Sequence, residues 1–203
     1  MAARAPRGTY AKGAAKREEI ILRAIELFGQ TGYYATSMRE IATACNLSQA
    51  GLLHHFPNKE SLLLAIVDHR EHLQSGGQPA DQPADQPAYE ESLVEHTMAT
   101  ARFNRDNESL TRLWAILVGE AVDQEHPAHE YFKERYRKTR KRFEKSFARD
   151  ASHSAPTKED QLKAAVLTAV WDGLQNQWLI DENFDMMGSF EYALKMLSSY
   201  SAK

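Results

Sequence analysis

The feature that most constrains the fold of this chain is a pair of closely spaced helix-start signals at Ser37 and Ser48. Residues 37–40 read Ser-Met-Arg-Glu, the S-x-x-E pattern of a capping box, in which the hydroxyl and the glutamate each satisfy a free backbone N–H. Ser48 is of the residue type that caps a second helix, over residues 49–55. Asn46 lies between the two signals and tolerates the left-handed backbone of a sharp turn. The pattern predicts two short helices joined by a tight turn.

Longer helices are predicted on both sides of this pair. Apolar residues at helical spacing indicate a helix over about residues 15–29, which ends at glycines. Asn58 is placed to cap another helix over about residues 59–73. Two short helices crossed by a preceding helix form a helix-turn-helix, whose second helix fits the DNA major groove. Residues 15–57 are therefore predicted to be a DNA-binding domain.

The rest of the chain also has helical periodicity, and no stretch alternates apolar and polar residues as a strand does. The expected fold class is all-α, with about nine helices in an N-terminal three-helix domain and a C-terminal helical domain over residues 58–203. The last two helices are predicted over residues 158–180 and 186–199. The polar, basic residues 1–14 are expected to form a flexible arm. The Gln-Pro-Ala-Asp repeats predict a disordered loop at about 75–88.

Charge and cysteine content fit a DNA-binding protein of a reducing compartment. Residues 1–60 hold eight Lys/Arg and five Asp/Glu, a surplus of +3, whereas the rest of the chain carries −6. A basic start on an acidic body favours nucleic-acid binding. Cys45 is the one cysteine, so no intramolecular disulfide is possible. The longest apolar run, residues 62–67, is much shorter than the about 20 residues of a membrane span. A cytoplasmic location without membrane contact is expected.

The second short helix supplies the candidate contacts to bases. Gln49 has the amide that pairs with adenine, and the small Ala50 and Gly51 allow close approach of the backbone to the groove. Met38 or Arg39 is expected to assist in sequence reading. Hydroxyl, imidazole and ammonium groups around the two helices are candidates for holding phosphates. The predicted DNA-binding residues are Thr36, Ser37, Met38, Arg39, Ser48, Gln49, Ala50, Gly51, His54, His55 and Lys59.

The residues of this segment resemble the DNA-binding signature of the TetR family of one-component regulators. The resemblance covers residues 16–66 and lies in residues 36–42, Leu47-Ser48, Leu52, His54 and the run from Phe56 to Leu62. Two positions depart from the family pattern, which usually has Gly where this chain has Asn46 and Tyr where it has Leu53. Leu53 lacks a hydroxyl that commonly contacts a phosphate in relatives, so that contact is expected to shift to His54, His55 and the N-terminal arm.

The resemblance implies a transcriptional regulator, usually a repressor, that binds a palindromic operator as a homodimer. In such proteins three helices bind DNA, the fourth links the domains, and the C-terminal helices hold a ligand cavity and a two-helix dimerisation face. A small-molecule ligand moves the fourth helix and releases the operator. The implied partners are double-stranded operator DNA, a second copy of the chain and a small-molecule effector of unknown identity, and no cofactor is expected.

Two apolar stripes near the C-terminus are candidates for the dimer interface, because wide apolar helix faces need a cover. The alternative is that both stripes face the core of the same chain. The predicted interface residues are Leu162, Val166, Ala169, Val170, Gly173, Leu174, Phe190, Leu194 and Leu197.

Aromatic and polar residues of the C-terminal domain are candidates for the walls of a ligand cavity. For each of them, ordinary core packing is the alternative. The predicted ligand-binding residues are Met98, Phe103, Trp114, Leu117, Tyr131, Trp171, Gln175 and Trp178.

Other motifs have simpler explanations. The pairs His69/His72 and His126/His129 have no third ligand at a telling spacing, so no metal site is predicted. The basic run over residues 135–145 matches i, i+4 ion pairing on a solvated helix face. The chain has no phosphate-binding glycine loop and no nucleophile motif, so it is not expected to be an enzyme. A ligand-independent DNA-binding protein and a transcriptional activator remain as alternatives.

Overall fold

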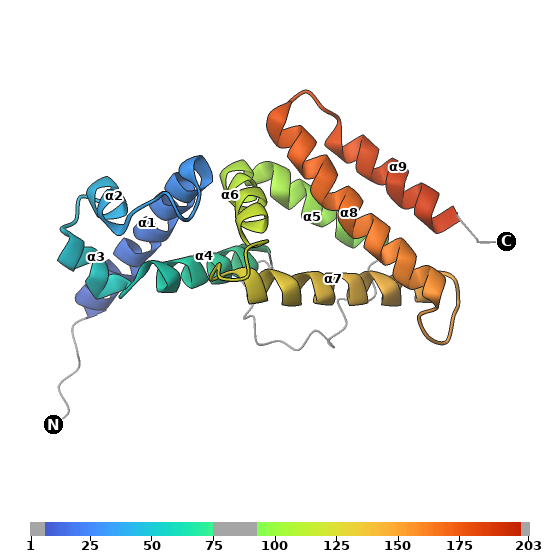
Figure 1. Cartoon of the computed structure of the whole chain (residues 1–203), viewed down its shortest axis with the longest axis horizontal. Coiled ribbons are helices and arrows are strands. Elements are labelled where there is room, and N and C mark those ends of the chain that lie inside the picture. Colours follow the sequence, from blue (N-terminus) through green and yellow to red (C-terminus); the bar gives the residue numbers. More distant parts are fainter. Residues whose placement is uncertain (1–6, 75–92, 200–203) are drawn as a thin grey trace. The chain divides into compact units, whose positions relative to one another are not determined.

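The computed structural model describes residues 7–74 and 93–199, and these form nine helices and no strand (Figure 1). The expectation of an all-α fold with about nine helices is confirmed. The chain divides into two compact units, residues 1–80 with helices α1–α4 and residues 81–203 with helices α5–α9. The predicted disordered loop at about 75–88 lies outside the described residues.

The N-terminal unit consists of α1 (Arg7–Thr31), α2 (Met38–Ala44), α3 (Gln49–His55) and α4 (Lys59–Gln74). Helix α1 begins at Arg7, so the prediction of a flexible arm over residues 1–14 is wrong for residues 7–14; residues 1–6 are not described. Alanine, lysine and arginine dominate residues 11–17, and these are strong helix formers that extend the helix outward from its apolar part.

The core of this unit forms where α1, α2, α3 and α4 each bury an apolar face. Helix α1 contributes a stripe at helical spacing, α2 and α3 contribute one or two residues each, and α4 closes the core from the other side. The compact unit therefore extends through α4, beyond the predicted boundary at residue 57. The fully or almost fully buried side chains are Ile20, Ala24, Phe28, Ile41, Cys45, Leu52, Phe56, Leu62, Leu63 and Ile66.

The C-terminal unit consists of α5 (Leu93–Asp106), α6 (Glu108–Glu120), α7 (His129–Asp150), α8 (Lys158–Ile180) and α9 (Met186–Ser199). The last two helices have the predicted bounds. Helices α8 and α9 pack together as a hairpin, and α7 packs against α8 (Figure 1). The core of this unit, to which α5, α7, α8 and α9 contribute, is built from Leu93, Phe143, Phe147, Ala164, Leu167, Phe190 and Leu194.

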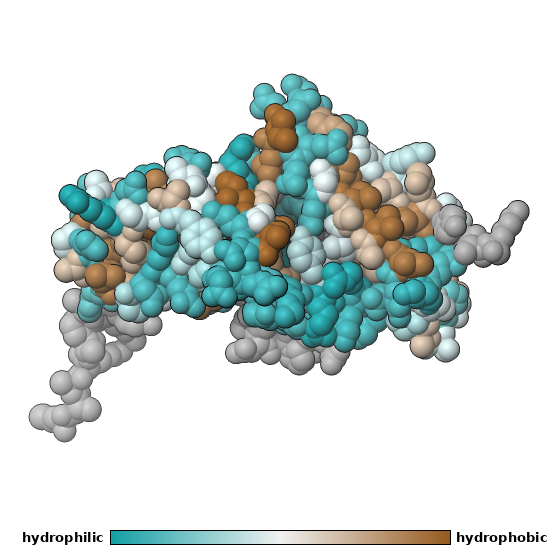
Figure 2. Space-filling model, in the orientation of Figure 1, coloured by the Kyte–Doolittle hydropathy of each residue, from teal (hydrophilic) through white to brown (hydrophobic). Residues whose placement is uncertain are grey.

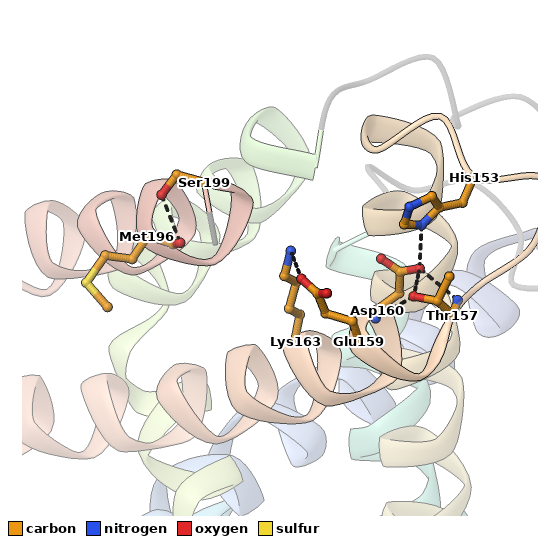
Figure 3. Close-up of polar contacts among 7 residues, drawn as sticks. All are labelled: His153, Thr157, Glu159, Asp160, Lys163, Met196 and Ser199. Carbon is orange, nitrogen blue, oxygen red and sulfur yellow. Dashed lines mark hydrogen bonds and ion pairs between the residues drawn. The ribbon is translucent and has the colours of Figure 1, made fainter. Parts of the chain in front are cut away.

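A buried carboxylate fixes the start of α8 (Figure 3). Asp160 accepts hydrogen bonds from the backbone N–H and the hydroxyl of Thr157, at 2.8 and 2.7 Å, and lies 2.9 Å from Nδ1 of His153. Burial opposes ionisation, but the hydrogen bonds from Thr157 and His153 outweigh it and hold the pKa of Asp160 below its usual value. This capping box sets where α8 begins and so positions the faces of α8 that are discussed below.

Candidate functional site

The two short helices have the capping and turn geometry that the sequence predicts. The Ser37 hydroxyl accepts from the backbone N–H of Glu40 at 3.2 Å, while the Glu40 carboxylate accepts from the backbone N–H of Ser37 at 2.7 Å. Hydrogen bonding of the Glu40 carboxylate to the hydroxyl and the backbone N–H of Ser37 holds the pKa of Glu40 below its usual value. The Ser48 hydroxyl accepts from the backbone N–H of Gly51 at 3.1 Å, and Asn46 has a φ of 53°. Each local signal is confirmed, and the result is a helix-turn-helix.

Helix α3 presents one face to the core and the other to solvent. Leu52 is completely buried, whereas Gln49, Ala50, Leu53 and His54 are exposed. The exposed positions follow the i, i+1, i+4, i+5 spacing of a single helix face. The outward face therefore carries one long amide side chain, one methyl group, one isobutyl group and one imidazole.

Of the other residues predicted to contact DNA, Ser37, Arg39 and Ser48 are exposed, and Met38, Gly51 and His55 are half-buried. The rings of His54 and His55 lie edge to face, with centroids 5.7 Å apart. All of these residues are at least partly exposed, and their contact with DNA remains a prediction.

The structure contradicts a phosphate-binding role for Thr36 and gives Lys59 a different one. Thr36 is 3% exposed, and its hydroxyl donates to the Gly32 carbonyl at 2.8 Å. The Lys59 ammonium donates to the carbonyl oxygens of Tyr33 and Thr36 at 2.8 and 3.0 Å, and lies 4.4 Å from the centre of the Tyr33 ring. The side chain of Lys59 thus ties α4 to the loop that precedes α2.

Replacing Lys59 with methionine separates these two roles. We expect Lys59→Met to lower the free energy of unfolding by about 1.5–3 kcal/mol, because charge-assisted hydrogen bonds to partly buried carbonyls are lost. The slope of log K against log salt concentration for DNA binding should not change. Chemical denaturation and DNA titration at several salt concentrations measure both quantities. A slope reduced by about one unit would instead show that Lys59 neutralises a phosphate.

Two residues of α1 that the sequence analysis missed hold the helix-turn-helix in place. The Lys16 ammonium donates to the carbonyl of Cys45, in the turn between α2 and α3, at 2.7 Å. The Arg17 guanidinium lies 4.1 Å from the centre of the Phe56 ring, at the end of α3. The basic pair at the start of the apolar stripe was the available signal, but only the packing of α1 shows where these side chains reach.

The predicted dimer-interface residues divide between an exposed set and the core. Leu162 is 56% and Val166 49% exposed, Ala169 is exposed, and Val170 and Gly173 are half-buried. These residues share one side of α8. Figure 2 shows apolar surface over α8 and α9 on the face in view. We call Leu162, Val166, Ala169, Val170 and Gly173 the α8 face.

The prediction is wrong for Phe190 and Leu194, which are buried in the core of their own chain. Leu174 and Leu197 are also packed against that core. The ring of Phe190 meets Trp171 edge to face with centroids 4.5 Å apart, so the inward stripe of α9 is already covered. The outward side of α9 instead exposes Tyr192 (67%) and Met196 (53%).

A small cavity of about 40 Å³ lies between α6 and α8. Its lining combines an aromatic ring, two aliphatic side chains and four polar residues. The carboxylate of Asp172 accepts a hydrogen bond from the Tyr136 hydroxyl at 2.6 Å, and the Asn104 amide donates to Gln175 at 2.6 Å. The lining residues are Thr111, Trp114, Ala115, Val118, Asp172, Gln175 and Asn176.

Two of the predicted ligand-binding residues, Trp114 and Gln175, line this cavity. Tyr131 packs edge-on against Trp114 with ring centroids 5.8 Å apart, behind the lining. Leu117 is completely buried, and Trp171 packs against the hydrophobic core, so the structure places both outside the lining of this cavity. The half-buried Met98, Phe103 and Trp178 are not part of its lining.

Comparison with known proteins identifies the N-terminal unit. Residues 20–66 match the family of bacterial regulatory proteins called the tetR family. An uncharacterized HTH-type transcriptional regulator of Bacillus subtilis (strain 168), YuxN, is 43% identical over 54 residues, which is 27% of this chain and 19% of the relative. The sequence match thus spans about a fifth of the length of that relative.

Solved structures extend the likeness to the whole fold. A complex of SmeT with triclosan has a TM-score of 0.67 at 22% identity and covers 90% of both chains. AibR, solved with isovaleryl coenzyme A and operator DNA, has a TM-score of 0.61 at 23% identity, over 90% of this chain and 96% of that one. At these identities the likeness concerns the fold. The match at residues 20–66 shows that the N-terminal unit carries the helix-turn-helix domain of the tetR family of bacterial regulatory proteins.

Proposed function

We propose that this protein is a cytoplasmic repressor that binds a palindromic operator as a homodimer and is released by a small-molecule effector. The observation that carries the proposal is the outward face of α3, which is exposed and polar at its N-terminal end while Leu52 anchors the helix from behind. A helix held in this way enters the major groove with its first residues against the base edges.

In the proposed complex, Gln49 reads adenine and Ala50 and Gly51 let the helix approach closely. Ser37, Ser48, His54 and His55 hold phosphates, and Arg39 assists from α2. The exposed residues of this set are Ser37, Arg39, Ser48, Gln49, Ala50 and His54.

The α8 face supports a homodimer. An exposed apolar stripe on a helix is stabilised when a second copy covers it, and a twofold interface needs a patch that is complementary to itself. Small residues at 169 and 173 allow two α8 helices to approach closely, with Tyr192 and Met196 of α9 beside them. A twofold dimer presents two copies of α3 to two half-sites, which is why the operator is expected to be palindromic.

The cavity between α6 and α8 supports an effector site. SmeT binds triclosan and AibR binds isovaleryl coenzyme A, so both neighbours in fold take small molecules. We infer that effector binding widens the cavity here, shifts α4 and changes the separation of the two α3 helices. The ligand acts only if it binds the released conformation more tightly than the DNA-bound one.

Replacing Gln49 with alanine tests the groove assignment. We expect Gln49→Ala to lose about 1–3 kcal/mol of discrimination at one base position in each half-site, because the bidentate amide contact is removed. Competition titrations with operators mutated at each position measure this preference. Gln30→Ala, which shortens an exposed side chain of α1, is the control. An unchanged base preference in Gln49→Ala would contradict the proposed placement of α3.

The size of the cavity favours one alternative, a regulator that binds DNA without a ligand. A volume of about 40 Å³ is small beside the about 300–1,000 Å³ of typical ligand pockets. In that case no small molecule would lower the affinity for operator. Screening metabolite mixtures for release of a labelled operator separates the two functions, since one releasing mixture excludes the alternative.

A further inference from the structure

The cavity between α6 and α8 contains a carboxylate with little hydrogen bonding. In the described part of the chain, the Tyr136 hydroxyl, at 2.6 Å from Oδ2, is the one donor to Asp172. An ionised carboxylate offers about four acceptor sites, so most of its capacity is unused. Burial raises the pKa of Asp172 above its usual value, although the hydrogen bond from Tyr136 opposes the shift.

The nearest cation does not form an ion pair with this carboxylate. Arg135 lowers the pKa of Asp172 through its charge, but no contact within 4.0 Å joins the two groups among the described residues. The Arg135 guanidinium instead lies 5.1 Å from the centre of the Trp114 ring. Asp172 is half-buried, and a charge there that no cation contacts within 4.0 Å gains from a cation that enters the cavity.

Of the other polar residues that line the cavity, Asn176 is exposed, and Gln175 and Thr111 already have hydrogen-bond partners. Gln175 accepts from the Asn104 amide at 2.6 Å, and the Thr111 hydroxyl donates to the Asn104 carbonyl at 2.9 Å. Asp172 is therefore the cavity-lining group that is best placed to accept further hydrogen bonds. The Trp114 ring lines the same cavity and has the Arg135 guanidinium 5.1 Å from its centre.

The size of the cavity limits which ligand groups can bind to the Asp172 carboxylate. About 40 Å³ is little more than the about 30 Å³ share of one water molecule in the liquid, so the cavity itself holds a compact polar group; it is partly open, so a hydrocarbon stem can extend out of it. A primary ammonium group is compact and carries three donors. Ala115 and Val118 supply apolar surface for a short hydrocarbon stem.

We propose that the cavity between α6 and α8 binds the ammonium group of a small primary amine, with Asp172 as its carboxylate partner. This inference rests on the proposed function, in which that cavity is the effector site. The effector is then an amine, and Asp172 determines selectivity for it over alcohols and acids of the same shape.

The test uses three probes of nearly equal size: n-propylammonium, n-propanol and propionate. Binding to the full chain is followed by NMR at the Trp114 indole N–H, which is assigned with a Trp114→Phe variant. We expect n-propylammonium to bind at least tenfold more tightly than the other two probes. We also expect Asp172→Asn, which keeps the shape of the side chain, to weaken amine binding at least tenfold. Glu125→Gln removes an exposed carboxylate and should bind the amine like the wild type.

Equal binding of the amine and the alcohol, or no amine binding at all, would overturn the inference. The comparison of probes uses wild-type protein and stands even if Asp172→Asn fails to fold. Operator binding is measured on the same preparations without any probe. Specific operator binding without amine binding would overturn this inference and leave the DNA-binding function intact. Amine binding without specific DNA binding would contradict the proposed DNA-binding function and leave the amine site intact.

Discussion

Replacing Leu52 with alanine is expected to abolish operator binding while the C-terminal unit stays folded. Leu52 is the one buried side chain of α3 and is completely inaccessible to solvent. Truncating a buried leucine to alanine costs about 2–5 kcal/mol, through lost burial and the cavity that remains. That is a large part of the stability of a small helical unit. We therefore expect α3 to lose its packing against α2 and the rest of the N-terminal unit.

The neighbouring residue provides a matched control. Leu53 is 39% exposed, and Leu53→Ala makes the same chemical change on the outward face of α3. We expect it to alter the free energy of unfolding by less than about 0.5 kcal/mol. Chemical denaturation followed by circular dichroism, together with operator titration, compares the two variants. Equal destabilisation by both substitutions would mean that the inward and outward faces of α3 are assigned wrongly.

Introducing a charge into the α8 face is expected to produce the second large effect. Val166 is 49% exposed at the centre of this face, and in a twofold dimer Val166→Glu brings two carboxylates close to each other. Like charges opposed in an interface cost several kcal/mol. We expect a monomer at micromolar concentration and an operator affinity lower by about 100-fold, because each 1.4 kcal/mol changes an equilibrium tenfold.

Sedimentation and operator titration measure the two consequences of Val166→Glu. Gln124→Glu adds the same charge at an exposed position between α6 and α7 and should leave both the mass and the affinity unchanged. A Val166→Glu protein that remains dimeric would place the interface elsewhere, with the outward side of α9 as the next candidate.

Local chemistry explains what the sequence predicts well. The caps at Ser37 and Ser48 and the left-handed turn at Asn46 depend on residues within three or four positions of each other. The bounds of α8 and α9 follow from periodicity and caps in the same way. Each of these features depends on residues close in sequence and not on distant parts of the chain.

The sequence predictions are wrong where the position of a side chain is set by a partner that is distant in sequence. The sequence predicts that Lys59 contacts a phosphate, but the packing of α4 brings its ammonium to the carbonyls of Tyr33 and Thr36. On α9, Phe190 and Leu194 form the most regular apolar stripe, and this stripe faces the core because it is the most apolar side. Trp171 is predicted to line a ligand cavity, but its ring packs against Phe190. Residue type and spacing do not specify which neighbour covers a given face.

The most direct test of the central claim is selection of duplexes from a random-sequence DNA library by the purified protein, followed by sequencing. The proposal predicts one enriched palindromic motif, with half-sites separated by about 10–10.5 base pairs or a multiple of it, as α3 helices of a twofold dimer require. Binding to that motif should weaken steeply with salt and resist unrelated competitor duplex. If folded, dimeric protein enriches no sequence motif from the library, that result would contradict operator recognition by α3.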